Sequence, residues 1–253
     1  MTVSRDLTPE DTAWADHFPE PPRINMNAKK PRESFVFNGT MLFRQLERAI
    51  LDYKPGEDIA AMDILEFGCG IGRCALPFFY KYQRPNQCID MAAKPLEFLR
   101  EVIPGANPQL SRYEPPLDFA DDSFDVIYSI SVWTHMTPEV GMKWLHEVKR
   151  MLKPGGLALL STSSFVPLKR HREHPERSAE WGDVSDDDLR REGVIFRGKE
   201  MKGMGGLYGC TVHNPDWVAE HWSQVMPVLE TRVNGAGGEM DGLQDLNIMQ
   251  KPA

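Results

Sequence analysis

The most informative segment of the chain is Met62-Asp63-Ile64-Leu65-Glu66-Phe67-Gly68-Cys69-Gly70-Ile71-Gly72-Arg73. An apolar run containing an acidic residue leads into three alternating glycines, and a helical pattern begins at Cys74. Glycine lets the backbone turn sharply and approach a ligand, because it has no Cβ. A strand, a glycine turn and the N-terminus of a helix together form a binding site for a nucleotide-type ligand. The segment alone does not say which nucleotide is bound.

Strands and helices alternate outward from this segment. The pattern predicts strands over 62–67, 87–90, 109–113, 124–129 and 157–162, and helices over 72–82, 94–102 and 138–152. The turn Lys153-Pro154-Gly155-Gly156 ends the last of these helices. A further helix over 215–225 and strands over 228–233 and 246–250 follow. Alternation of this kind predicts a parallel, doubly wound α/β sheet with helices on both faces.

Two segments stand outside the alternation. Residues 1–58 are predicted to be an irregular arm followed by a helix over 39–53, with Asn38 as its cap. This helix either packs on the sheet edge or closes over the ligand. Within the main domain, 59–253, residues 163–207 break the rhythm and are predicted to be an inserted lid on the acceptor side. Ser185 and Asp188 would cap a short helix there.

Composition narrows the class of protein. The 253 residues hold 29 Lys+Arg and 37 Asp+Glu, a net charge of −8, from which we expect neither nucleic acid nor an anionic membrane surface as partner. The four cysteines form no C-x-x-C pair, so neither a zinc ribbon nor a disulfide framework is indicated. No apolar run approaches the roughly 20 residues of a membrane span, and we expect a cytoplasmic protein.

A dinucleotide fold is the first alternative for the glycine segment. Gly70-Ile71-Gly72-Arg73-Cys74-Ala75 fits the pattern G-x-G-x-x-A of nicotinamide-binding proteins. Glu66 argues against it, because a carboxylate there suits a cationic amine better than a pyrophosphate. Arg73 in the first helical turn, and two later motifs at 124–129 and 150–156, are not required by a dehydrogenase.

Four motifs in order resemble those of the class I S-adenosylmethionine-dependent methyltransferases. They are Glu66-x-Gly68-x-Gly70-x-Gly72, Asp90 at the end of the second strand, the strand Phe124–Ser129 and the turn Leu152–Gly156. The resemblance covers about residues 60–162. It implies a Rossmann-like, mostly parallel seven-stranded sheet with an antiparallel last strand. A narrower resemblance, in 131–136 and 242–246, is to a bacterial group associated with O-methylation of sugars and surface polysaccharides.

The resemblance also implies a binding role for individual residues. Asp90 would accept hydrogen bonds from both ribose hydroxyls, and Glu66 would lie near the ammonium of the methionine part. Met91 would pack on the adenine. The full set of implied cofactor-binding residues is Glu66, Gly68, Cys69, Gly70, Gly72, Arg73, Asp90, Met91, Tyr113, Glu114, Ser129, Ile130 and Ser131.

His135 is the candidate catalytic base, because it follows the fourth strand at the end where ligands bind in such sheets. Its alternative roles are to cap the next helix or to bond to a backbone carbonyl. The candidates for shaping the acceptor pocket are Trp133, Trp181, Tyr208, His213 and Gln244. For the two tryptophans core packing is an equal alternative. No cluster of metal ligands is visible in the sequence, so we expect transfer without a metal.

These observations predict methyl transfer from S-adenosylmethionine to a small or medium polar acceptor, with an oxygen of a sugar-like molecule favoured. Transfer to nitrogen or sulfur of a metabolite or peptide is an alternative. A nicotinamide-dependent oxidoreductase and a non-catalytic nucleotide-binding module are alternatives of another class. The sequence identifies neither the acceptor nor the oligomeric state.

Overall fold

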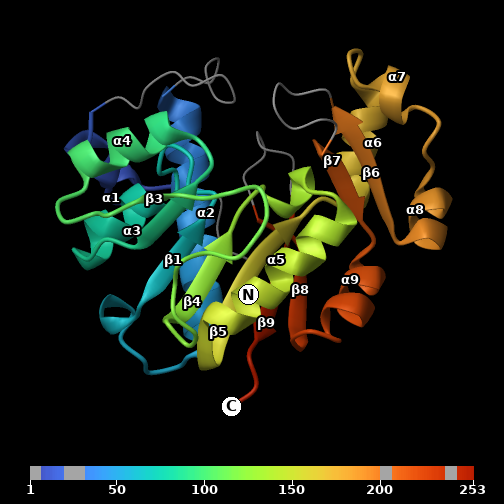
Figure 1. Ribbon diagram of the computed structural model, residues 1–253. Helices are drawn as coiled ribbons and strands as arrows, with labels where there is room; N and C mark the ends of the chain where they lie inside the picture. The colour runs from blue at the N-terminus through green and yellow to red at the C-terminus, as the bar shows by residue number, and fades with distance from the viewer. Residues whose placement is uncertain (1–6, 20–31, 200–206, 237–243) are drawn as a thin grey trace.

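The computed structural model describes residues 7–19, 32–199, 207–236 and 244–253 (Figure 1). Within these residues, seven strands form one sheet in the order β3-β2-β1-β4-β5-β9-β8. The strands are β1 (Ile64–Phe67), β2 (Gln87–Asp90), β3 (Gln109–Leu110), β4 (Phe124–Ser129), β5 (Leu152–Thr162), β8 (Val228–Ala236) and β9 (Gln244–Gln250). Strands β1 to β5 are parallel, and β9 runs antiparallel to both β5 and β8. The predicted sheet, with its antiparallel last strand, is confirmed.

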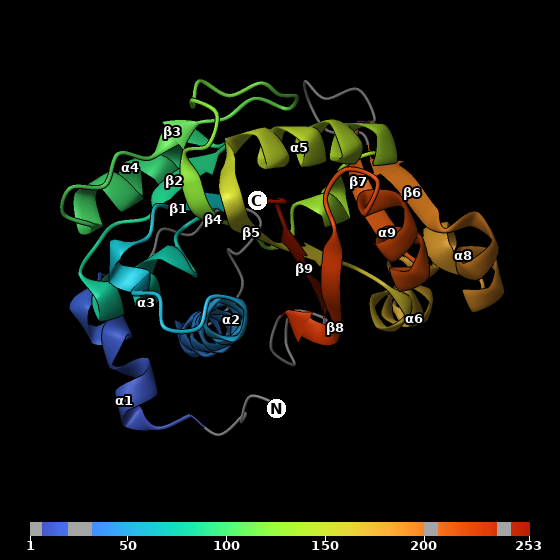
Figure 2. The ribbon, with the colours of Figure 1, turned by 90° about the horizontal axis from the view of Figure 1, so that it is seen from below.

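Helices cover both faces of the sheet (Figure 2). The long helices on one face are α2 (Arg32–Tyr53) and α3 (Ala75–Tyr82), with α4 (Ala93–Val102) beside α3; α5 (Pro138–Met151) and α9 (Pro215–Trp222) lie on the other. Successive residues of a strand point to opposite faces, so Tyr128 packs with the α2 and α3 side chains and Ile127 with those of α5. Both faces of the central strands are therefore buried in core.

The strand order reverses between β1 and β4. Strand β1 has β2 on one side and β4 on the other. The connections that follow β1 and β4 therefore leave the sheet in opposite directions. Ligands of open α/β sheets bind at such a point. The glycine segment after β1 and the residues after β4 both lie there.

Two predicted helices differ at their start. Helix α2 already includes Arg32, so Asn38 lies inside the helix and is buried rather than capping it. Helix α3 begins at Ala75 instead of Gly72. The reason is backbone geometry: Gly68, Gly70 and Gly72 all have positive φ, and left-handed residues do not continue a right-handed helix.

The inserted segment is more regular than expected. It forms α6 (Phe165–Glu173), α7 (Ser178–Trp181), α8 (Asp186–Glu192) and β6 (Val194–Lys199), and β6 pairs antiparallel with β7 (Tyr208–His213). The Ser185–Asp188 capping box of α8 is present as predicted. Leu168, Trp181 and Val212 belong to a separate small core of this segment. Figure 1 shows it at one end of the sheet, beyond α5.

The remaining short elements are α1 (Pro9–Thr12), η1 (Ala13–His17), η2 (Ile59–Ala61) and η3 (Trp133–His135). In the described part of the chain, no helix combines the length and the apolar character needed to cross a membrane.

Candidate active site

The three glycines after β1 have different surroundings. All are left-handed, with φ of +75° at Gly68, +51° at Gly70 and +80° at Gly72. A Cβ on Gly68 would lie 2.3 Å from Val132, and one on Gly72 would lie 2.4 Å from Leu99. A Cβ on Gly70 would have no described heavy atom within 4 Å. Gly70 is therefore the glycine whose open side a ligand can approach.

Asp90 is fixed beside this loop at the end of β2. Its Oδ2 accepts the backbone N–H of Gly70 at 2.8 Å, and its Oδ1 accepts that of Ala92 at 2.8 Å. Each carboxylate oxygen can accept a second hydrogen bond, which suits the two neighbouring hydroxyls of a ribose. The next residue, Met91, is 45% exposed and offers an apolar surface beside the carboxylate.

Glu66 lies buried beneath the loop. The Tyr128 hydroxyl donates to Glu66 Oε2 at 2.9 Å, and the Asn86 amide donates to that hydroxyl at 3.0 Å. Burial raises the pKa of Glu66 to about 8, although the hydrogen bond from Tyr128 and the charge of Arg73 act in the opposite direction. A cation placed beside such a carboxyl favours its ionised form. Glu66 is thus suited to an ammonium group, and Arg73 is part of its electrostatic surroundings.

The end of β4 lies beside the end of β1, and Val132, three residues after Ser129, contacts Gly68 of the glycine loop. Ser129 is buried and donates its hydroxyl to the Phe67 carbonyl at 2.8 Å, while Ile130 packs at the edge of the α2 core. Ser131 has a left-handed backbone, with φ of +63°, and donates its N–H to Ser161 Oγ at 2.8 Å. Gln244, at the start of β9, completes this group by donating to Ser131 Oγ at 2.9 Å.

His135 is held by the first residues of β7. Its Nδ1 lies 2.7 Å from the Gly209 carbonyl oxygen, and its ring stacks on Tyr208 with centroids 4.8 Å apart. A carbonyl oxygen only accepts, so the proton of the neutral ring is on Nδ1 and Nε2 carries the lone pair. The bond to a backbone carbonyl was the alternative role for His135, and it is compatible with a basic Nε2. Burial raises the pKa of Tyr208 to about 12, which keeps its hydroxyl protonated.

The third strand is shorter than predicted. A different residue from the one expected therefore lies next to Asp90. β3 ends at Leu110, and Ser111 follows it directly, donating its N–H to the Asp90 carbonyl at 2.8 Å. The Ser111 hydroxyl is buried and has no partner among the described residues. Sequence reasoning missed this position because the strand was extended to Tyr113.

Tyr113 and Glu114, which belong to the implied cofactor-binding set, have partners within the protein. Glu114 forms an exposed ion pair with Lys143, Nζ to Oε2 3.1 Å. The Tyr113 hydroxyl donates to the Leu207 carbonyl and so connects the loop after β3 to the inserted segment. The Glu114 side chain is therefore on the surface, where it pairs with Lys143.

Other predicted side chains are in cores. Cys69 is buried. Trp133 packs between Phe67 and Trp222, and Trp181 lies in the core of the inserted segment. His213 is 3% exposed beside Trp222, and burial lowers its pKa to about 3. Both tryptophans therefore pack in cores, which was the alternative to a role in the acceptor pocket. His213, expected at the acceptor pocket, is a neutral core residue because its position on β7 faces inward.

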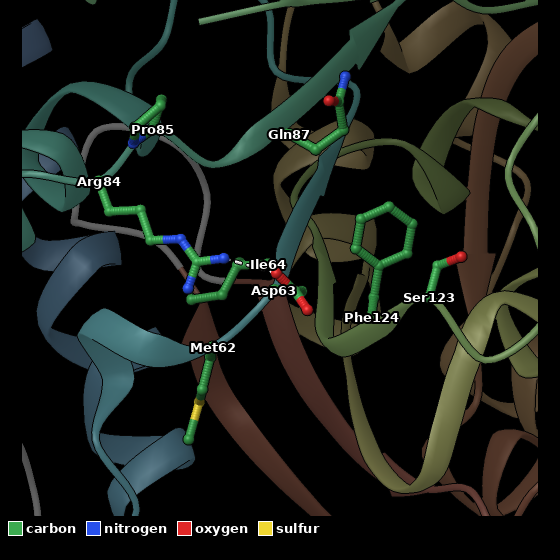
Figure 3. Close-up of a pocket in the computed structure, with 8 residues that line it drawn as sticks. All are labelled: Met62, Asp63, Ile64, Arg84, Pro85, Gln87, Ser123 and Phe124. Carbon is green, nitrogen blue, oxygen red and sulfur yellow. Dashed lines mark hydrogen bonds and ion pairs between the residues drawn. The ribbon is translucent and has the colours of Figure 1, made fainter. Parts of the chain in front are cut away.

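A separate pocket lies at the amino ends of the parallel strands, opposite the glycine loop (Figure 3). Its volume is about 260 Å³, and its lining residues are Met62, Asp63, Ile64, Arg84, Pro85, Gln87, Ser123 and Phe124. Ile64, Gln87 and Phe124 are the first residues of β1, β2 and β4. Figure 3 shows the Arg84 guanidinium turned toward Asp63, with which it pairs. The pocket is therefore at the opposite end of β2 from Asp90. No group of three or more potential metal-ligating side chains occurs in the ranges that the structure describes.

Comparison with known proteins agrees with this geometry. Residues 64–156 match a methyltransferase domain. A putative S-adenosylmethionine-dependent methyltransferase from Listeria monocytogenes superimposes with a TM-score of 0.58 at 12% identity, over 85% of this chain and 98% of that one. One from Mesorhizobium loti has a TM-score of 0.56 at 14% identity, over 81% and 97%. The domain match and the two superpositions confirm the predicted Rossmann-like methyltransferase fold.

Two curated relatives add information about acceptors. The tRNA N(3)-cytidine methyltransferase METTL2 of Mus musculus is 32% identical over 124 residues, 42% of this chain and 30% of the relative. The biotin biosynthesis bifunctional protein BioHC of Cellvibrio japonicus is 31% identical over 139 residues, 51% of this chain and 26% of the relative. The chain therefore spans about a third or less of the length of these relatives.

The tRNA methyltransferases overturn one expectation. From the net charge of −8 we expected no nucleic-acid partner, and relatives that act on tRNA contradict that prediction. Net charge is a sum over the whole chain and does not report the local surface around an active site, so it does not decide the acceptor.

Proposed function

We propose that this chain transfers the methyl group of S-adenosylmethionine to a polar acceptor at the carboxyl ends of β1 and β4. The observation that carries the proposal is the pairing of Asp90 with the Gly70 N–H, beside the open side of that glycine. A carboxylate with room for further hydrogen bonds next to a backbone that a ligand can approach supports a ribose site here.

Different residues around the loop bind different parts of the donor. Asp90 binds the ribose and Met91 covers one side of the adenine, while Glu66 lies toward the ammonium end. Bound S-adenosylmethionine supplies a methyl group on a positively charged sulfur. When the acceptor attacks, the carbon–sulfur bond breaks with its electron pair going to sulfur, and S-adenosylhomocysteine is the product. The protein contributes by holding donor and acceptor in line.

Asp90→Ala tests the donor site. We expect S-adenosylhomocysteine binding, measured by isothermal titration calorimetry, to weaken at least about 100-fold, because the variant loses two charge-assisted hydrogen bonds. Asp187→Ala on α8, which removes an exposed carboxylate paired with Arg190, should bind like the wild type. A wild-type protein that shows no heat and no thermal stabilisation with either S-adenosylmethionine or S-adenosylhomocysteine would refute the proposal.

A cytidine base of tRNA is the first acceptor class that we propose. The support is the relatives, which are named as N(3)-cytidine methyltransferases. The N3 of cytosine has a lone pair and no proton, so its methylation requires no base. The assay is incubation with unmodified tRNA, followed by mass spectrometry of the digested nucleosides for methylated cytidine.

A hydroxyl of a sugar-like molecule is the second acceptor class. The support here is His135, whose Nδ1 is committed to the Gly209 carbonyl, so that Nε2 carries the lone pair of the neutral ring. An alcohol must lose its proton as it attacks, and a histidine near neutral pH can take it.

His135→Gln separates the two classes, because only the alcohol reaction needs a proton acceptor. With a hydroxyl acceptor we expect kcat to fall about 100-fold or more and the acid limb of the pH–rate profile to disappear. With cytidine N3 we expect kcat to change by less than about threefold, since there is no proton to remove. In both cases donor affinity, measured by calorimetry, should stay unchanged; a lost donor affinity would remove His135 from the acceptor side.

A further inference from the structure

Three polar side chains from three strand ends form a closed hydrogen-bonded group. Ser131 follows β4, Ser161 lies near the end of β5, and Gln244 begins β9. The Ser131 N–H donates to Ser161 Oγ at 2.8 Å, and the Ser161 hydroxyl donates to Gln244 Oε1 at 2.7 Å. The Gln244 amide closes the ring of hydrogen bonds by donating from Nε2 to Ser131 Oγ at 2.9 Å. Each residue thus fixes the next.

The direction of these bonds follows from burial. Ser161 is fully buried, so its hydroxyl proton needs a partner inside the protein. If the Gln244 amide were turned over, its NH₂ would donate to Ser161 and leave the Ser161 proton unpaired. The observed orientation avoids that cost. As a result Ser131 receives a hydrogen bond from Gln244, and its own hydroxyl proton is directed elsewhere.

The Ser131 hydroxyl proton has no acceptor among the described residues, and Ser131 is only half-buried. Its left-handed backbone is unfavourable for a residue with a Cβ, and such strain collects at ligand-binding positions. The adjoining residue, Val132, packs directly on Gly68, where a Cβ would approach it to 2.3 Å. Ser131 therefore lies next to a residue that contacts the glycine loop.

We propose that Ser131 donates this proton to the carboxylate of the donor's methionine part, and that Gln244 is the positioning residue that keeps the hydroxyl in the donating direction. The inference rests on the proposed function, because it assumes that S-adenosylmethionine occupies the loop. It predicts that a residue of the last strand, far along the sequence, affects donor binding. It also gives this site a preference for ligands that retain the amino-acid end.

Two ligands isolate the contact. S-adenosylhomocysteine has the methionine carboxylate, whereas 5′-methylthioadenosine has the same nucleoside and thioether without the amino acid. Calorimetry with both ligands on each variant therefore reports the carboxylate separately from the rest of the donor. Ser131→Gly removes the hydroxyl and suits the left-handed backbone, so the variant should fold at least as stably as the wild type.

Gln244→Glu tests the positioning role. At neutral pH the introduced carboxylate accepts from both serines, and the Ser131 proton then points inward. We expect S-adenosylhomocysteine to bind at least about tenfold more weakly to Ser131→Gly and to Gln244→Glu, with 5′-methylthioadenosine unchanged. Lowering the pH should restore the Gln244→Glu affinity relative to the wild type, because a protonated carboxyl donates again to Ser131.

Gln250→Glu is the matched control. It makes the same substitution at the far end of β9, where the Gln250 amide bonds to the Gly155 carbonyl, and should bind both ligands like the wild type. Unchanged S-adenosylhomocysteine affinity in Ser131→Gly and Gln244→Glu would overturn the inference, and so would an equal loss for both ligands. A wild-type protein that binds neither ligand would instead refute the proposed function itself.

Discussion

At the residue scale, the glycines of the loop share a backbone conformation but differ in what a side chain would meet. Gly70→Ala places a methyl group in open space, so we expect a loss of about 1–2 kcal/mol of stability from left-handed strain together with at least about a tenfold loss of S-adenosylhomocysteine affinity. Gly72→Ala adds a clash with Leu99 to the same strain, so we expect a loss of about 2–5 kcal/mol. Urea unfolding and calorimetry measure the two effects.

The control for both variants is Gly56→Ala. Gly56 has φ of +81° and no described heavy atom within 4 Å of an added Cβ, and it lies in the turn after α2. The variant should show the strain alone, with donor affinity unchanged. If Gly70→Ala also bound the donor normally, Gly70 would not face the ligand.

The sequence could predict the glycine turn but not the division of roles within it. Alternate glycines after an apolar run indicate left-handed turns locally. Whether each one faces a ligand or a neighbour depends on Val132 and Leu99, which lie about 30 to 60 residues away in sequence. In the same way the position of Asp90 at the end of a strand was predictable, whereas the proximity of Ser161 to Gln244 depends on the pairing of β5 with β9.

At the scale of elements, helix α2 supports the glycine loop. A Cβ on Gly39 would lie 2.6 Å from the Arg73 carbonyl oxygen and 3.1 Å from the Trp14 ring. Because the closest atom is backbone, Gly39→Ala must displace either the helix or the loop. We expect donor affinity, measured by calorimetry, to fall about three- to tenfold although Gly39 lies on a helix outside the loop.

Gly141→Ala is the comparison for this prediction. Gly141 is also a buried helical glycine, but it lies in α5, and its added Cβ would meet only the Trp133 ring at 3.2 Å. Donor affinity should therefore stay at the wild-type value. Equal losses in both variants would mean that general loosening of the core, rather than contact with the loop, explains the effect.

Elements were predictable where their signals are local. The box of Ser185 and Asp188 starts α8 as expected, because both partners lie within one helical turn. The hairpin of β6 and β7 was missed, since its two strands are separated by residues 200–207 and become strands only by pairing with each other. The position of His135 beside Gly209 follows from that hairpin, so the partners of the candidate base were not predictable either.

At the scale of the whole molecule, charge was the least reliable guide. The −8 net charge excludes nucleic acid only if the charges are spread evenly. In the inserted segment many cations already pair with acids, such as Arg172 with Asp186 and Arg191 with Asp188.

Periodicity, by contrast, predicted the sheet correctly, because each strand must be buried on both faces.

Two buried groups give the fold opposite responses to pH. Burial raises the pKa of Glu66 to about 8 and lowers that of His213 to about 3. The neutral Glu66 carboxyl stabilises the folded state fully below its unfolded pKa of about 4.5, and this contribution is lost as pH rises through 8. The neutral His213 ring stabilises it above its unfolded pKa of about 6.5, and that contribution is lost as pH falls toward 3.

Between about pH 4.5 and 6.5 the two slopes oppose each other, so we expect a plateau of unfolding free energy there. On each side only one of these two groups titrates, and it contributes a slope of up to about 1.4 kcal/mol per pH unit. Glu66→Gln should flatten the alkaline limb between pH 6.5 and 8 and leave the acid limb. His213→Phe should reduce the acid limb below pH 4.5 and leave the alkaline one. Urea unfolding from pH 3 to 9 measures both limbs. An alkaline limb that survives in Glu66→Gln would show that Glu66 is already ionised in the folded protein.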